Sequence, residues 1–124
     1  MAGTVTVTED VSNGPIKKIQ WSWTSTAGGA ADLITSLTYN GIVLSCVTDP
    51  GSTAPDDNYD ITITDPDSYD ILQGAGANRD TTTTETCAPT AKSAAVGKLT
   101  LNVTNAGSAK VGVVTLFILG TAAP

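Results

Sequence analysis

Apolar and polar side chains alternate one by one along much of this chain, and no other feature constrains the fold as strongly. In the segment 4–8, Val5 and Val7 occupy one face and threonines occupy the other. In the segment 16–25, Ile19, Trp21 and Trp23 share one face in the same way. A period of two residues is typical of a half-buried β-strand. About eight such segments, with turn residues between them and no convincing helix, predict one all-β domain over residues 1–124, a single antiparallel β-sandwich of jelly-roll type.

The dipeptide Asn40-Gly41 is the strongest local turn signal in the sequence. Both residues accept the positive φ that a type I′ turn requires, so we expect a β-hairpin between strands over 33–39 and 42–48. Both faces of 42–48 are fairly apolar, which predicts a central position in a sheet. We also expect a polar edge strand over 81–86, one helical turn around 91–95, and a hairpin turn at 105–108 before the last strand, 111–119.

The apolar positions of these strands define the expected core. Trp21 and Trp23 could also form the stacking platform of a carbohydrate-binding module, because their side chains share one face. Large alternating apolar residues are more often core, and we favour that interpretation. The predicted core consists of Val5, Val7, Ile19, Trp21, Trp23, Leu37, Leu44, Ile61, Ile63, Leu99, Leu101, Val103, Val113, Leu116 and Phe117.

Charge and composition argue against several classes of function. The net charge is −6, which disfavours binding to nucleic acids and to anionic membranes and favours a more basic protein partner. The chain has no histidine, so it lacks the commonest general base and the commonest metal ligand. Its start lacks the basic and apolar regions of a signal peptide, and no apolar run is long enough for a spanning helix. We therefore expect no enzyme activity, no catalytic residues and no cofactor.

The two cysteines, Cys46 and Cys87, stand 41 positions apart. They could form a disulfide or a redox pair, or they could be two free thiols of a protein assembled in the cytoplasm. Free thiols are the favoured interpretation. Two cysteines without histidine or a Cys-x-x-Cys spacing do not make a zinc site.

Aspartates are concentrated in the middle of the chain. Several carboxylates could hold Ca²⁺, but the spacing fits no EF-hand loop. Aspartate is also a common turn residue that accepts hydrogen bonds from nearby backbone N–H groups, and this interpretation is favoured. We expect no metal site, and two Glu and six aromatic residues are too few for a glycosidase cleft. The residues concerned are Asp49, Asp56, Asp57, Asp60, Asp65, Asp67 and Asp70.

Arg79 is the single arginine of the chain and lies between Asn78 and Asp80 in a glycine-rich loop. The loop fails the spacing of a phosphate-binding motif, because Arg79 occupies the position of the last glycine. The residue could lock the loop through an ion pair with Asp80 or another aspartate, which is the favoured interpretation. It could also anchor an interface, since arginine is enriched at binding hot spots. Our candidates for contact with a partner are Arg79, Asn78, Asp80, Asp56 and Asp57.

Several stretches resemble small virion proteins of tailed bacteriophages. The resemblance rests on the opening Val5–Asp10, on Lys17-Lys18-Ile19 with Trp23-Thr24-Ser25, on Asn58–Asp67, and above all on Asp70–Thr81 with its unusual Gly-Ala-Gly-Ala-Asn-Arg-Asp loop. It extends over nearly the whole chain.

The resemblance implies a capsid decoration, or cement, protein that binds the outer surface of the shell and stabilises it. The implied partner is the major capsid protein, with self-association to a dimer or trimer, and the implied location is the capsid exterior after assembly in the host bacterial cytoplasm. That reducing compartment agrees with free thiols at Cys46 and Cys87. No catalytic or binding residues come with the resemblance.

Two alternatives remain open, a tail or neck component and a receptor- or carbohydrate-binding β-sandwich module. A sugar-binding module should expose Trp21 and Trp23 in a concave site. A decoration protein should bury both and show flat or loop-built contacts instead.

Overall fold

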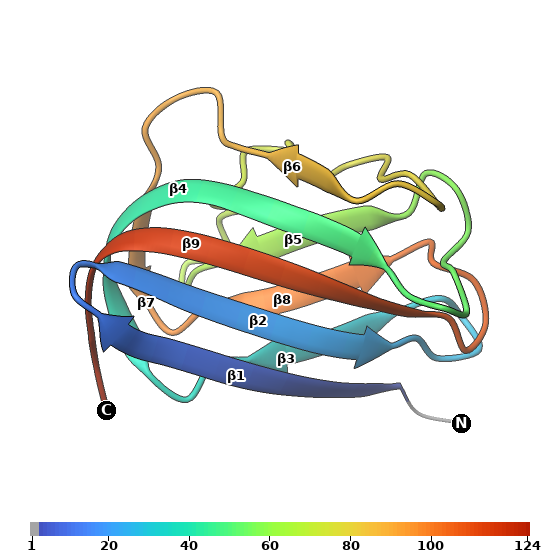
Figure 1. Ribbon diagram of the computed structural model, residues 1–124, viewed down its shortest axis with the longest axis horizontal. Helices are drawn as coiled ribbons and strands as arrows, with labels where there is room; N and C mark the ends of the chain where they lie inside the picture. The colour runs from blue at the N-terminus through green and yellow to red at the C-terminus, as the bar shows by residue number, and fades with distance from the viewer. Residues whose placement is uncertain (1–2) are drawn as a thin grey trace.

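The computed structural model describes residues 3–124, which form nine strands and no helix (Figure 1). Two antiparallel sheets pack face to face with one shared core, as the alternating pattern predicts. No helix among the described residues could cross a membrane. The strands are β1 (Thr4–Asn13), β2 (Ile16–Thr24), β3 (Ala31–Ile34), β4 (Thr38–Pro50), β5 (Asp60–Thr64), β6 (Glu85–Cys87), β7 (Ala94–Gly97), β8 (Thr100–Thr104) and β9 (Val111–Ala123).

The larger sheet has the order β1-β2-β9-β4, with β6 and β7 both paired along the far edge of β4, and the smaller sheet has the order β3-β8-β5. From β2 to β9 every connection crosses between the sheets except β6 to β7. This repeated crossing is the mark of a jelly roll, so the predicted fold class is confirmed. Strand β4 lies between β9 and the β6–β7 edge, which confirms its predicted central position.

The core lies between the two sheets, and the alternation identifies much of it correctly. Of the predicted members, Ile19, Trp21, Trp23, Ile61, Ile63, Leu99, Leu101, Val103 and Leu116 are buried. Val5, Val7 and Leu37 are partly buried and pack against this cluster. The prediction is wrong for Leu44, Val113 and Phe117, which lie on the outer face of the larger sheet, while Val114 and Ile118 of β9 point inward instead.

A β-bulge in β4 explains why Leu44 is 42% exposed. The register of β4 against β9 shifts between Val43 and Ser45. An extra residue in one strand reverses the alternation beyond it, so Val43 and Cys46 both face the core although they are three residues apart. Leu44 then has the outward position.

The expected hairpin at Asn40-Gly41 is wrong, because β4 runs through both residues without turning. Gly41 lies directly opposite Gly120 of β9. A Cβ atom on Gly41 would come within 2.4 Å of the Leu119 carbonyl oxygen, and one on Gly120 within 2.1 Å of the Asn40 carbonyl oxygen. Glycine is therefore needed here for the close approach of two backbones and not for a positive φ. The predicted strand 33–39 is also divided, since β3 ends at Ile34 and β4 begins at Thr38.

Three other local expectations need correction. The helical turn around 91–95 is absent from the structure, and Ala94–Gly97 forms β7 with Ala95 buried in the core. An edge strand is present, but the expected bounds 81–86 are wrong: β6 spans only Glu85–Cys87, and residues 81–84 lie in the loop before it. Residues 105–108 do not close a hairpin, because they carry the chain from β8 in one sheet to β9 in the other. Pairing with β4 determines the conformation of the first two segments, and the change from one sheet to the other determines the course of 105–108.

Candidate interaction surface

The two loops that the sequence singles out meet at one end of the sandwich. The backbone N–H of Asn58 donates to the Arg79 carbonyl over 3.0 Å, and the N–H of Arg79 donates to the Tyr59 carbonyl over 2.7 Å. A third loop joins them, since the N–H of Asp56 donates to the Ala106 carbonyl over 2.9 Å. We call the surface formed by 51–59, 74–84 and 105–110 the loop end; it brings together all five residues predicted to contact a partner.

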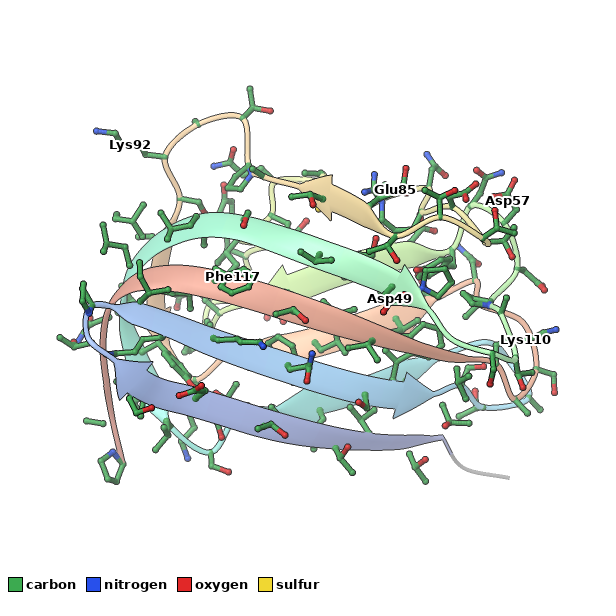
Figure 2. All side chains as sticks on the ribbon, in the orientation of Figure 1. Asp49, Asp57, Glu85, Lys92, Lys110 and Phe117 are labelled. Carbon is green, nitrogen blue, oxygen red and sulfur yellow. The ribbon has the colours of Figure 1, made fainter. Side chains whose placement is uncertain are left out.

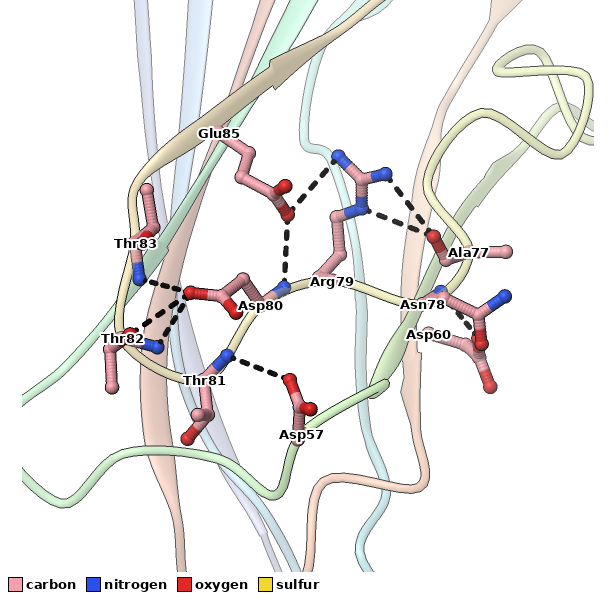
Figure 3. Close-up of polar contacts among 10 residues, drawn as sticks. All are labelled: Asp57, Asp60, Ala77, Asn78, Arg79, Asp80, Thr81, Thr82, Thr83 and Glu85. Carbon is pink, nitrogen blue, oxygen red and sulfur yellow. Dashed lines mark hydrogen bonds and ion pairs between the residues drawn. The ribbon is translucent and has the colours of Figure 1, made fainter.

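Carboxylates brace these loops from within (Figure 3). One Asp60 oxygen accepts the Asn78 backbone N–H over 2.9 Å, and the other accepts the Asn105 side-chain amide over 2.6 Å. Asp80 closes the next turn by accepting hydrogen bonds from Thr83 and Thr82, which lower the pKa of this exposed carboxyl below its ordinary value. The favoured interpretation of the aspartates as acceptors of local backbone N–H groups is confirmed at Asp65 and Asp70, whose carboxylates accept from N–H groups two and four residues further along the chain. Asp60 differs, because both of its partners are distant in the sequence.

The Arg79 side chain is directed back into the protein and is only 14% exposed. Its guanidinium donates twice to the Ala77 carbonyl and lies 3.6 Å from Glu85, which also accepts the Asp80 N–H over 2.9 Å (Figure 3). Arginine thus locks the loop as expected, but the partner is Glu85 and not Asp80 or another aspartate. The sequence does not reveal this pairing, because it depends on the start of β6 lying beside the loop. Direct contact of Arg79 with a partner stays a prediction.

Most of the exposed charged side chains at the loop end are acidic. Asp56 and Asp57 are exposed, and Asp57 accepts only a long hydrogen bond of 3.4 Å from the Thr81 N–H. Asp49 at the end of β4 accepts the Thr84 hydroxyl over 2.9 Å. Figure 2 shows Asp49, Asp57 and Glu85 at this end with Lys110, whereas Lys92 lies at the opposite end. Among the described residues, no group of three or more acidic or cysteine side chains could hold a metal ion. The arrangement suits recognition of a basic surface.

A second surface, missed by the sequence analysis, lies on the outer face of the larger sheet. Ile42 pairs with Leu119 across β4 and β9, and both are more than two-fifths exposed. Leu44 and Val96 are exposed close by, on β4 and β7, and Phe117 lies on the same face of β9 (Figure 2). We call these five residues the outer apolar patch. Leu44 and Phe117 are both predicted core residues, and the two errors have different causes. The bulge in β4 turns Leu44 outward, whereas β9 carries apolar residues on both faces, so the sequence pattern does not separate its inner face from its outer face.

Bracing by Asp60 gives a first testable prediction. Asp60→Ala removes the acceptor for both Asn78 and Asn105, and we expect it to lower the free energy of unfolding by about 1–2 kcal/mol, since hydrogen bonds to a charged acceptor are lost at a half-buried site. Urea unfolding measures the loss. Asp67→Ala is the matched control, because it deletes the same charge from an exposed turn and should change stability by less than about 0.5 kcal/mol. Equal effects of the two variants would contradict the bracing role.

Comparison with known proteins yields a distant structural likeness. No family model matches the chain, and no curated protein gives a significant match. A solved structure from a study of the promiscuous specificity of carbohydrate-binding modules of the β-sandwich superfamily is similar, with a TM-score of 0.42 and 14% sequence identity. The match covers 100% of this chain and 55% of that one, so this chain spans about half the length of the solved protein. The similarity is one of fold.

Proposed function

We propose that this protein is a non-enzymatic structural component of a tailed-bacteriophage particle, a capsid decoration protein that binds the major capsid protein on the outer surface of the shell. The proposal begins from the resemblance of the sequence to small phage virion proteins. In this proposal the chain assembles in the host cytoplasm and acts on the virion exterior as a dimer or trimer.

The braced, acidic loop end is the observation that carries the proposal. Three loops from different parts of the chain are tied together by backbone hydrogen bonds and by Asp60, so their shape is fixed before any partner binds. A preformed surface loses little conformational entropy on binding. Exposed carboxylates such as Asp56 and Asp57 complement basic patches of a shell. Many copies on one particle allow each weak contact to contribute to the stability of the whole.

The outer apolar patch supports the same class of function. Grouped apolar side chains on an exposed sheet face are typical of protein–protein contact surfaces. Such a flat surface is what the decoration hypothesis expects beside loop-built contacts.

The two alternative functions can be distinguished from this proposal, one by whether the tryptophans are exposed and the other by where the protein attaches to the particle. Trp21 and Trp23 are 0% and 2% exposed, so these two side chains offer no stacking platform to a sugar. Burial of both is what the decoration hypothesis expects, and it weighs against the carbohydrate-binding alternative. A tail or neck component shares the same surfaces and is distinguished by where it attaches.

Attachment to shells that lack the protein tests the proposal. Purified chain added to such particles should co-sediment with them, and binding should weaken as salt rises, because exposed charges are screened. The double variant Asp56→Asn, Asp57→Asn should bind more weakly by a factor of up to about five, because it loses two charges at the rim of the contact.

The control for this experiment is Asp65→Asn combined with Asp67→Asn, which makes the same change of charge at a turn that follows β5, away from the loop end. It should bind as the unaltered protein does. Equal weakening by both double variants would indicate a general charge effect, and absence of any co-sedimentation would overturn the proposal. Retention on immobilised polysaccharides with no affinity for shells would favour the carbohydrate-binding alternative.

A further inference from the structure

Cys46 and Cys87, which are far apart in the sequence, lie directly opposite each other in the structure. They are register partners in the antiparallel pair of β4 with β6. Opposed residues in such a pair have Cα atoms roughly 4.5–5.5 Å apart, which is inside the range of about 4.4–6.8 Å that a disulfide spans. Both side chains point to the same face of the sheet, because cross-strand partners always do. Both are free thiols in the structure.

The two thiols differ in their surroundings. Cys46 is fully buried in the core, whereas Cys87 on the edge strand is only partly buried. The Cys46 S–H donates a hydrogen bond to the Cys87 sulfur, which raises the pKa of Cys46 and lowers that of Cys87 to about 7. The Arg79 guanidinium also lowers the pKa of Cys87, against burial and the Glu85 carboxylate. Cys87 is therefore the reactive thiol and Cys46 is its neighbour.

We propose that Cys46 and Cys87 form a redox-responsive pair, which stays reduced in the cytoplasm and closes to a cross-strand disulfide when the folded protein meets a small-molecule disulfide. The proposal goes beyond shell binding and does not depend on it. The bond would tie the edge strand β6 to the central strand β4. It would also close a loop of chain that contains Asp56, Asp57 and the segment 74–84, which are two of the three parts of the loop end.

The reaction is an ordinary thiol–disulfide exchange in two steps. The Cys87 thiolate attacks one sulfur of the oxidant, so a mixed disulfide forms, the oxidant S–S bond breaks, and the first thiolate leaves and takes up the proton that Cys87 released. The Cys46 sulfur then attacks the Cys87 sulfur, so the intramolecular S–S bond forms and the mixed disulfide bond breaks. The second thiolate of the oxidant leaves and takes up the proton that Cys46 releases. Two protein thiols are oxidised, and one small disulfide is reduced to two thiols.

Oxidised glutathione is the probe for a test on the folded, full-length chain. Reduced protein incubated with it at 25 °C without denaturant should lose both reactive thiols and two hydrogens in mass, and it should remain a monomer on a non-reducing gel. Its melting temperature should rise by roughly 5–15 °C, because the bond constrains the unfolded chain, and a reductant should reverse the rise. Protein isolated from the cytoplasm, denatured without reductant, should show two free thiols.

The single-cysteine variants define the roles of the two thiols. Cys46→Ser should stop at one glutathione attached to Cys87, and Cys87→Ser should react at least about tenfold more slowly, because Cys46 is buried. The proposal is overturned if the unaltered protein accumulates two glutathione adducts, forms dimers linked by an intermolecular disulfide, or melts at a lower temperature after oxidation. Shell binding by the reduced protein is measured separately, so either proposal can fail alone.

Discussion

Trp21→Ala is expected to lower the free energy of unfolding by about 3–5 kcal/mol, the largest loss among the single replacements considered. Trp21 is 0% exposed and extends from β2 into the space between the sheets. Removing the indole leaves a cavity that the close-packed core cannot fill without rearrangement. Because a domain of this size is stable by only about 5–15 kcal/mol, the shift in the urea midpoint will be large. Trp23→Ala should lower the free energy of unfolding by a similar amount. It also removes the contact with the Tyr59 ring, whose centroid lies 5.8 Å from that of the Trp23 ring.

Two further variants make the test specific to burial. Trp21→Phe should cost less, because it keeps an aromatic ring and the indole N–H has no hydrogen-bond partner among the described residues. Phe117→Ala removes a large aromatic side chain from the outer face of the same sheet, and we expect a loss of about 1 kcal/mol. If Trp21→Ala and Trp23→Ala leave stability unchanged but abolish sugar binding, the protein belongs to a different functional class.

Gly41→Ala should destabilise the protein by about 2–3 kcal/mol, although it adds one methyl group. The added Cβ would lie 2.4 Å from the Leu119 carbonyl oxygen and 2.7 Å from the Ile118 side chain, so β4 and β9 would have to separate where they pair most closely. Urea unfolding measures the loss, and hydrogen exchange should show weaker protection of the amides that pair around Gly120.

Gly28→Ala is the matched control for this substitution. Gly28 has no positive φ, and a Cβ there meets nothing closer than 3.7 Å. The change should stay within about 0.5 kcal/mol. A similarly small effect of Gly41→Ala would mean that the strands do not approach as the structure has them.

The alternation in the sequence predicts the sandwich because period-two patterns are produced directly by burial of one face of a strand. Strands β2, β5 and β8 follow the pattern without interruption, and the sequence identifies their buried apolar residues correctly. The errors occur where distant parts of the chain override local preference. Asn40-Gly41 has the composition of a turn, but its glycine serves the contact with Gly120, which is 79 positions away. The bulge at Leu44 carries no local signal, so alternation alone assigned that residue to the core.

The candidate surfaces were predictable to different degrees. Turn chemistry located the loops that contain Asp56, Asp57 and Asn78–Asp80, and those loops do form one surface. Their mutual contacts were not predictable, because most pass through backbone groups or through partners such as Glu85 and Asn105 that have no motif. The outer apolar patch was not predictable, because the bulge in β4 carries no local signal and β9 has apolar residues on both of its faces. The pairing of Cys46 with Cys87 depends on the register of β4 with β6, which spacing in the sequence does not give.

The central claim, attachment to the outside of a phage shell, is tested most directly by imaging particles made with and without the protein. Three-dimensional reconstructions of the two particles should differ by density of the size of one β-sandwich domain per copy, repeated at symmetry-related positions on the outer shell surface. The acidic loop end should be the part of that density closest to a basic patch of the shell, and adding purified protein to the deficient particles should restore the density. Density confined to the tail or neck, or identical shells in both reconstructions, would contradict the account.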